Sequence, residues 1–389
     1  MEKALDSAGP LAGLLVVDLS RVLAGPFATM LLADMGARII KVEQPGGDDS
    51  RRFGPFMGEG DSGYFASVNR GKQSLVLDLK LAGDRRILDA LLDRADVLAE
   101  NFRPGTLARL GYGWAALHAR WPRLILASTS GFGQTGPDSA RPAYDVIVQA
   151  LGGLMSLTGP EGGAPVRVGT SVGDLTAGMF TVIGILAALR DRDRSGLGQQ
   201  VDVAMFDCQI ALLENAIVQY QVTGKSPGPL GTRHPTITPF QAVETADRPI
   251  VLAAGNDGLW QALCAAVGLE GAALDARFAS NASRTAHAAA LLALLEARLK
   301  TAPAAHWLAL LTAAGIPCGQ INSVAEALAN PQVAARAMLV DSATAGGRPL
   351  KVAGNPVKLS GRADARTRGP APALDGDRAA ILAEFGVDI

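Results

Sequence analysis

The stretch LLVVDLSRVLAGPFATMLLADMGARIIKVE, residues 14–43, decides the fold of the first half of the chain. Residues 14–20 are mostly apolar and predict a buried strand, and residues 37–43 predict a second one. Between them, residues 24–36 predict a helix that ends at Gly36. A helix between two short apolar strands is typical of a parallel β-α-β unit.

The same alternation continues along the chain. Further strands are predicted at 74–79, 95–100 and 123–129, and a helix is predicted at 82–93, where leucine and isoleucine recur at helical spacing. We therefore expect an α/β fold with an open parallel sheet. Ligands bind such sheets at the carboxyl ends of the strands, so a site is expected in the polar loops that follow Asp18, Glu43, Glu100 and Thr129.

The second half predicts a smaller unit. Two long helices are expected at 175–191 and 201–221, and a Gly- and Pro-rich linker at 223–239. Beyond the linker, a strand is expected at 248–255, helices at 257–267, 285–300 and 304–314, and a last helix near 376–385. The predicted domains are 1–222 for a large domain, 225–330 for a small domain and 331–389 for a C-terminal segment that returns to the large domain.

Composition limits the classes of function. Of 389 residues, 48% are hydrophobic and 19% are charged, and the net charge is −1, which gives no electrostatic reason to expect nucleic acid or an anionic membrane as partner. The three cysteines are far apart, so neither a disulfide framework nor a zinc site is predicted, and no other metal site is expected. The N-terminus does not resemble a secretory signal, and the longest apolar run, 179–189, is too short to span a bilayer. We expect a cytoplasmic protein.

Residues 131–136, GFGQTG, match the G-x-G-x-x-G pattern of dinucleotide sites. In such a site the third glycine lies in the first turn of a helix. Here Pro137 follows the third glycine and Pro142 comes soon after, so a tight loop at a strand end is favoured over a phosphate-binding turn.

Residues 169–173, GTSVG, match the G-x-S-x-G pattern of serine hydrolases and mark Ser171 as an alternative nucleophile. His234, His287 or His306 would supply the base, although no Asp–His pairing stands out. Asp174 follows directly. It is a typical N-cap residue for the next helix, and the helix dipole at an N-cap favours an ionised carboxylate. A carboxylate between small residues also suits a nucleophile in covalent catalysis.

Six long segments resemble the family III CoA-transferases, the family of the formyl-CoA and carnitine CoA-transferases and their sister α-methylacyl-CoA racemases. In chain order, these segments are LSRVLAGPFATMLLADMGARIIKVEQPGGDDSR, NRGKQSLVLDLK, ENFRPGTLARLGYGW, STSGFGQTGPDSARPAYDVIVQALGGL, VGDLTAGMFTVIGILAALRDRDRSGLGQQVDVAMFD and AAGIPCGQINSVAEAL. The resemblance covers nearly the whole chain.

The resemblance implies a mechanism and a set of site residues. The nucleophilic aspartate of the family falls on Asp174, which would form an acyl anhydride and then a thioester with CoA. Acyl-CoA and a small carboxylic acid are the implied substrates, and no tightly bound cofactor is implied. Positions that match CoA contacts of the family are Val22, Leu23, Gln44, Leu77, Lys80, Asn101, Phe102, Arg103, Arg109 and Tyr144.

Some positions depart from the family pattern. Some members carry glutamine at Leu23 and many carry arginine at Gln44, and a glycine-rich lid loop of formyl-CoA transferase is replaced by residues 231–240. Racemases have a histidine where this chain has Tyr144, so transferase is favoured over racemase.

The segments at 21–30 and 231–243 look most like a succinyl-CoA-dependent dicarboxylate branch, in which Arg21, Arg233 and His234 would bind a second carboxylate. The implied fold is a large Rossmann-like domain with a smaller α/β domain, in a homodimer of interlocked rings.

Overall fold

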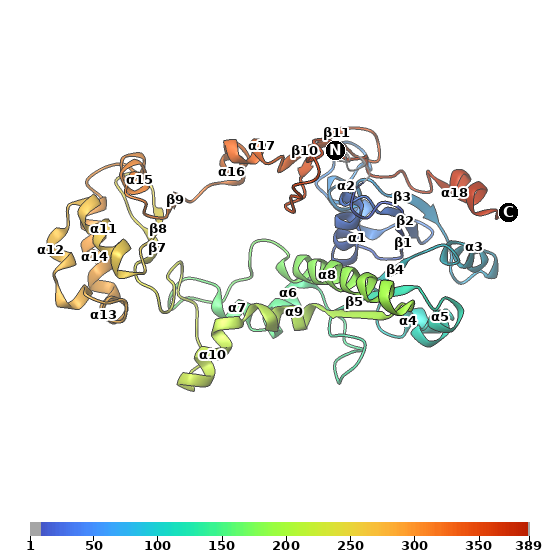
Figure 1. The fold of residues 1–389 in the computed structure, drawn as a ribbon, viewed down its shortest axis with the longest axis horizontal. Coiled ribbons are helices and arrows are strands. Elements are labelled where there is room, and N and C mark those ends of the chain that lie inside the picture. The colour runs from blue at the N-terminus through green and yellow to red at the C-terminus, as the bar shows by residue number, and fades with distance from the viewer. Residues whose placement is uncertain (1–8, 388–389) are drawn as a thin grey trace. The chain divides into compact units, whose positions relative to one another are not determined.

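The computed structural model describes residues 9–387 as two compact units (Figure 1). The first unit comprises the chain up to residue 154, residues 167–218 and the chain from residue 330 onward, and the second comprises 155–166 and 219–329. The first eight residues of the N-terminal stretch that was compared with secretory signals lie outside the described range.

A six-stranded parallel sheet forms the centre of the first unit. In chain order its strands are β1 (Leu15–Asp18), β2 (Arg38–Glu43), β3 (Gln73–Val76), β4 (Val97–Glu100), β5 (Ile125–Ser130) and β6 (Gln200–Ala204). Their order across the sheet is β3-β2-β1-β4-β5-β6, and each neighbouring pair is parallel. The α/β fold with a parallel sheet is thus confirmed, and its strand order is that of Rossmann folds. The order reverses between β1 and β4, which defines the switch point where ligands bind such sheets.

Helices cover both faces of this sheet. On one face, α1 (Ala24–Asp34) and α8 (Val172–Ser195) pack on Val16, Ile39 and Ile125. On the other face, α3 (Ala82–Leu92), α5 (Trp114–Arg120) and α18 (Arg378–Phe385) enclose a larger core. Val16 and Val17 belong to opposite cores because successive side chains of a strand point to opposite faces.

The region from 172 to 223 differs from the prediction. The helix expected at 175–191 extends over Val172–Ser195 and ends at Gly196, which has the left-handed φ of a helix C-terminus. The helix expected at 201–221 is wrong. Its first residues form β6 on the sheet edge, and the remainder is α9 (Met205–Leu212) and α10 (Glu214–Thr223), separated at Glu214, whose φ is 24°.

By length and composition alone, α8 is apolar enough to cross a membrane, because the structure extends it well beyond the run at 179–189. Half of its most apolar window is buried, against α1 and the sheet. Such burial is typical of a core helix of a globular domain.

Several further elements are short and belong neither to the parallel sheet and its covering helices nor to the core of the second unit. They are the 3-10 helix η1 (Asp49–Arg52), α2 (Gly63–Asn69), α4 (Thr106–Arg109), α6 (Asp145–Leu151), α7 (Leu154–Leu157), α16 (Val324–Leu328), α17 (Pro331–Ala335) and the antiparallel pair β10 (Leu339–Ala343) and β11 (Pro349–Ala353). The C-terminal segment reaches the sheet edge at β3. There Asp377 and Asp375 accept the backbone N–H groups of Ser74 and Val76, and the backbone N–H of Asp375 donates to the hydroxyl of Ser74.

The second unit has a three-stranded antiparallel sheet with the order β7 (Phe240–Val243), β8 (Ile250–Ala253) and β9 (Cys318–Gln320). Its helices are α11 (Asp257–Val267), α12 (Glu270–Ala273), η2 (Ala276–Phe278), α13 (Asn281–Ala286), α14 (Ala288–Leu299) and α15 (Ala304–Ala313). The helix predicted at 285–300 is divided at His287. Trp260, Trp307 and the guanidinium of Arg284 are buried in the core of this unit.

Candidate active site

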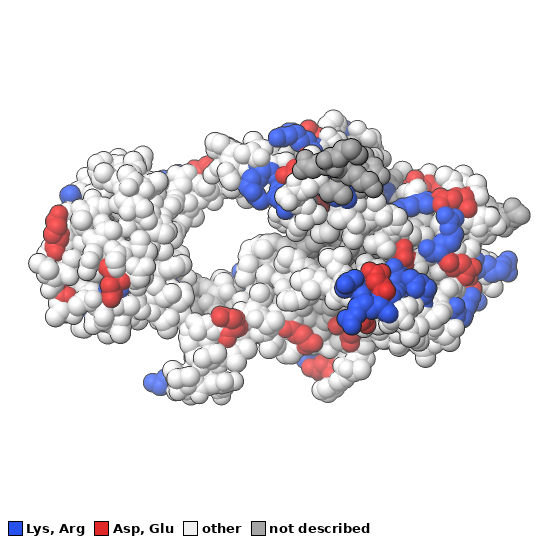
Figure 2. Space-filling model, in the orientation of Figure 1, with Lys and Arg blue, Asp and Glu red and all other residues white. Residues whose placement is uncertain are grey.

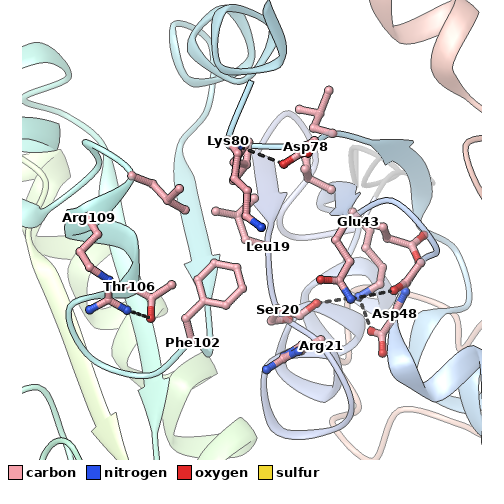
Figure 3. Close-up of a pocket in the computed structure, with 17 residues that line it drawn as sticks. Leu19, Ser20, Arg21, Glu43, Asp48, Asp78, Lys80, Phe102, Thr106 and Arg109 are labelled. Carbon is pink, nitrogen blue, oxygen red and sulfur yellow. Dashed lines mark hydrogen bonds and ion pairs between the residues drawn. The ribbon is translucent and has the colours of Figure 1, made fainter. Parts of the chain in front are cut away.

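The first unit has a cavity of about 300 Å³ at the switch point of its sheet. It lies beside the residues that follow β1, β2, β3 and β4. Figure 3 shows Lys80, Phe102 and Arg109 around this cavity, with Leu19 and Ser20 from the end of β1. Six of the residues matched to CoA or substrate contacts line it, namely Arg21, Gln44, Leu77, Lys80, Phe102 and Arg109.

The exposed cations of this cavity have few partners, unlike the buried Lys41 that also lines it. Arg109 donates a hydrogen bond of 3.0 Å to the hydroxyl of Thr106, and Arg21 forms an exposed ion pair of 3.3 Å with Asp49. Within residues 9–387, the side chains of Lys80 and Arg109 form no ion pair. Unpaired, exposed cations beside the apolar side chains of Leu77 and Phe102 suit a ligand that carries phosphates on an organic body. Elsewhere on the face in Figure 2, basic and acidic side chains are interspersed.

A second cavity of about 190 Å³ adjoins the first, with which it shares Arg21 and Phe102. It contains the other matched positions of the first unit, namely Val22, Leu23, Asn101, Arg103, Tyr144 and Asp174. The structure therefore brings together every predicted site residue except Arg233 and His234.

Asp174 lies in the first turn of α8, three residues after the N-cap residue Ser171. The expectation that Asp174 is the N-cap is wrong, because Ser171 has that position. Burial, together with the negative charge of Asp145, raises the pKa of Asp174 to about 7, and no hydrogen bond from residues 9–387 offsets these effects. Its carboxylate is thus poorly solvated and uncompensated, as a nucleophile at neutral pH requires.

Asp145 takes the capping role instead. Its Oδ1 accepts the backbone N–H of Gly173 at 2.8 Å, and its Oδ2 accepts the side-chain amide of Gln149 at 2.8 Å. Gln149 in turn accepts the backbone N–H of Val168 at 2.9 Å. Asp145 therefore fixes the segment before Asp174 and raises the Asp174 pKa. Sequence reasoning missed this role, although Asp145 directly follows the predicted contact Tyr144.

The GFGQTG motif forms a loop after β5 and not a phosphate-binding helix start, as the two prolines indicated. Gly131 is required by space, since a Cβ there would lie 2.5 Å from the Cβ of Ala143. This close approach brings Gly131, Arg141 and Tyr144 to the wall of the second cavity, opposite the loop after β1. Arg141, which the sequence did not single out, is an exposed cation that lines the same cavity as Asp174 and lies 3.7 Å from Asp138.

A network of buried charges lies beneath the loop after β1. Lys41, fully buried on β2, is 2.8 Å from Asp48 and donates to the carbonyl of Ser20 at 2.7 Å. Lys41 lowers the pKa of Asp48 to about 2, against the opposing effect of burial. Removing one partner of such a buried pair costs about 3–5 kcal/mol. A lysine in the middle of an apolar strand was the available signal, and sequence reasoning did not use it.

Three predicted residues have partners that bear on their roles. Both polar atoms of the Asn101 side chain bind the backbone of Arg21, at 2.9 and 2.8 Å. In the second unit, Arg233 forms an ion pair of 2.7 Å with Glu161, and His234 accepts the backbone N–H of Thr236 at 3.2 Å.

Ser171 lacks the setting of a hydrolase nucleophile. No strand precedes it in residues 158–170, so the strand–turn–helix elbow is not formed. Of the four histidines, the first unit contains only His118, on α5.

α/β proteins bind nucleotide derivatives in cavities at the switch point of a parallel sheet, where this cation-lined cavity lies, and the carboxylate of Asp174 in the adjoining cavity is a candidate nucleophile. The family model for CoA-transferase family III matches residues 11–378. The chain is 50% identical over 379 residues to acetyl-CoA:oxalate CoA-transferase of Acetobacter aceti, covering 97% of this chain and 96% of that one. It is 40% identical over 383 residues to succinate–glutarate CoA-transferase of Agrobacterium fabrum, covering 97% and 96%.

A crystal structure of a CAIB/BAIF family protein from Brucella suis is similar, with a TM-score of 0.85 and 41% identity over 97% of this chain and 99% of that one. The chain belongs to CoA-transferase family III and is an enzyme of the CoA-transferase type.

Proposed function

We propose that the protein transfers CoA from an acyl-CoA donor to a small carboxylic acid through covalent intermediates on Asp174. The observation that supports this most directly is the uncompensated Asp174 carboxylate, which lies in a cavity that adjoins a second, cation-lined one. In this proposal, Lys80 and Arg109 bind the phosphates of CoA, and the pantetheine arm passes Phe102 to reach Asp174.

The exchange proceeds in balanced steps. The ionised carboxylate of Asp174 attacks the thioester carbonyl and expels CoA thiolate, which leaves an aspartyl-acyl anhydride. The thiolate attacks the aspartyl carbonyl of this anhydride and releases the donor acid, which leaves an aspartyl-CoA thioester. The acceptor carboxylate attacks that thioester and expels CoA thiolate, which leaves a second anhydride, and the thiolate then attacks the acceptor carbonyl of this anhydride. Acyl-CoA leaves and Asp174 is restored as a carboxylate.

Each attack places negative charge on a carbonyl oxygen, so the site needs hydrogen-bond donors there. Leu23 is the N-cap residue of α1, and Leu23 and Ala24 line the cavity of Asp174. The first backbone N–H groups of a helix lack partners within the helix. These groups are the proposed donors to the oxygen of the anhydride and thioester intermediates.

The acceptor is proposed to be a dicarboxylate. The two relatives described above are named for oxalate and for succinate and glutarate, all of which are dicarboxylic acids. A second carboxylate near Asp174 needs a cation, and Arg21 and Arg141 line that cavity. Succinyl-CoA is the proposed donor. Contributions of Arg233 and His234 stay predictions.

The test is an exchange assay with a panel of acids. Purified protein is incubated with succinyl-CoA or acetyl-CoA and with oxalate, glutarate or acetate, and new acyl-CoA is followed by mass spectrometry. We expect exchange with at least one dicarboxylate and none with the variant Asp174→Asn, whereas Asp193→Asn, an exposed change in the last turn of the same helix, keeps full activity.

Trapping by hydroxylamine identifies the nucleophile. A hydroxamate on Asp174 supports the mechanism, and a label on Ser171 contradicts it. Hydrolysis without exchange indicates a thioesterase, and deuterium incorporation at Cα without exchange indicates a racemase.

Two further expectations are proposals of the same kind. A homodimer of interlocked rings would bury apolar side chains that are exposed on α8 in one chain, such as Ile183, which is 59% exposed. Sedimentation of the purified protein tests the dimer. The cytoplasmic location stays a prediction from the sequence.

A further inference from the structure

Val22, between β1 and α1, has a backbone conformation that its side chain disfavours. Its φ is 67°, in the left-handed region, which β-branched residues rarely adopt. Such a conformation persists only where the surrounding structure holds it, and it is found most often at functional sites. Val22 lines the same cavity as Asp174.

The carboxylate of Asp48 holds the strained residue on one side. The backbone N–H of Val22 donates to both of its oxygens, at 3.2 and 3.3 Å. This carboxylate is itself fixed by the ammonium group of Lys41 at 2.8 Å and by the hydroxyl of Ser50 at 2.8 Å. Lys41 also donates to the carbonyl of Ser20, so one buried cation binds both the loop and the carboxylate that holds it, as the dashed lines in Figure 3 show.

The side chain of Asn101, which follows β4, holds the loop on the other side. Its Oδ1 accepts the backbone N–H of Arg21 at 2.9 Å, and its Nδ2 donates to the carbonyl of Arg21 at 2.8 Å. With these two bonds, both polar atoms of the amide bind the backbone of a single residue. Three consecutive residues, 20–22, are thus each bound by a polar side chain that comes from a different part of the sheet edge.

We propose that Asp48 and Asn101 are positioning residues that keep Val22 in its left-handed conformation, so that the backbone N–H groups at the start of α1 face Asp174. The inference rests on the proposed function for its catalytic consequence. Neither residue touches the reacting atoms in this account. If Val22 relaxed to a negative φ, the peptide units of Leu23 and Ala24 would turn and the proposed donors would leave the cavity.

The principal test is rescue by glycine at position 22. Asp48→Ala should lower kcat about 30-fold and leave KM for acyl-CoA within about threefold, because positioned donors act on the transition state more than on the bound substrate. Glycine adopts a positive φ freely, so Val22→Gly in the same chain should restore kcat to within about threefold of Val22→Gly alone. Asn101→Ala should behave as Asp48→Ala does.

Asp61→Ala provides the matched control. Asp61 is another buried carboxylate of the first unit, and it binds the hydroxyl of Thr344 and the backbone of Gly346 rather than the backbone of residues 20–22. If Asp61→Ala lowers kcat, Val22→Gly in the same chain should not restore it. If Asp48→Ala does not fold, Asp48→Asn keeps an acceptor oxygen for the Val22 amide while losing the ion pair, and the same rescue is expected on a smaller loss.

The proposal is overturned if Asp48→Ala raises KM in proportion to the loss of kcat, if it leaves kcat unchanged, or if glycine at position 22 restores nothing. A second measurement does not depend on activity. The loss of melting temperature on Asp48→Ala should be smaller in the Val22→Gly background than in the wild type. Equal losses of melting temperature in the two backgrounds contradict the proposal that Asp48 holds Val22 in its left-handed conformation. A wild-type protein without exchange activity contradicts the proposed function alone.

Discussion

Replacing Asp174 with asparagine should stabilise the protein, and increasingly so as the pH rises. The pKa of this buried carboxyl is raised from 3.8 to about 7, chiefly by burial and further by Asp145. Below about pH 3 the carboxyl is largely neutral in both the folded and the unfolded chain, so asparagine changes little. Between pH 4 and 7 the unfolded chain is ionised and the folded chain is not, so wild-type stability falls as the pH rises. Above pH 7 both states are ionised and the full penalty is present.

The size of the effect follows from the shift. About three pKa units at about 1.36 kcal/mol each give an upper value of about 4 kcal/mol at pH 8. The same relation gives about 1.6 kcal/mol at pH 5, so the advantage of asparagine should grow by about 2.5 kcal/mol between the two pH values. Partial solvent exposure of the side chain makes these figures upper values.

The assay is thermal unfolding of both proteins at pH 5 and pH 8. At roughly 2 °C per kcal/mol for a large domain, the gain in Tm should be about 3 °C at pH 5 and about 8 °C at pH 8. Asp193→Asn, the same change at an exposed position of the same helix, should stay within about 1 kcal/mol at both. A gain for Asp174→Asn that is equal at the two pH values, or a loss at pH 8, refutes the reasoning.

Three further predictions concern the pH profile of the reaction, the side chains assigned to phosphate binding and the buried arginine of the second unit. The kcat/KM for acyl-CoA should rise with pH to a plateau, with its midpoint near pH 7, because Asp174 must be ionised to attack. Asp145→Asn should move that midpoint to lower pH, since it removes a negative charge that raises the Asp174 pKa. A flat profile from pH 5.5 to 8 argues against Asp174 as nucleophile. Lys80→Ala and Arg109→Ala should each raise KM for acyl-CoA about tenfold and leave KM for acyl-pantetheine unchanged, since only CoA carries the phosphates. Equal effects on both substrates contradict the assignment of Lys80 and Arg109 to phosphate binding. Arg284→Met should reduce the free energy of unfolding of the second unit by about 3–5 kcal/mol in urea titrations. The reason is that the buried guanidinium binds the carbonyls of Thr238, Phe278 and Gly255. A reduction below about 1 kcal/mol contradicts a stabilising role of these hydrogen bonds.

The sequence predicted the sheet well wherever burial was complete. Strands β1, β2, β4 and β5 each contain a short apolar run next to turn residues, and this signal does not depend on tertiary contacts. Strand β6 was missed because it is a partly exposed edge strand whose apolar residues continue into α9, so that its short alternation resembles the beginning of a helix.

The location of the site was predictable and its electrostatics were not. Residues that follow parallel strands meet at one edge of the sheet, which is why loops scattered over residues 21–174 line two adjoining cavities. The charge state of Asp174 depends on burial and on Asp145, which is distant along the chain, and both arise from packing. Asn101 was matched to a ligand contact, yet its side chain is occupied by the backbone of Arg21, a pairing that only the folded loop reveals.

The turn between β1 and α1 distinguishes this protein from a dinucleotide-binding one. In that class the turn is glycine-rich and presents the helix N-terminus to the pyrophosphate. Here the turn is Ser20–Leu23, with Val22 strained, and the start of α1 lines the cavity of Asp174 instead. If this helix start serves the acyl chemistry, phosphate binding depends on the side chains of Lys80 and Arg109. Exposed cations are screened by salt more than fixed backbone groups are. KM for acyl-CoA should therefore rise steeply between low and physiological ionic strength while kcat stays nearly constant.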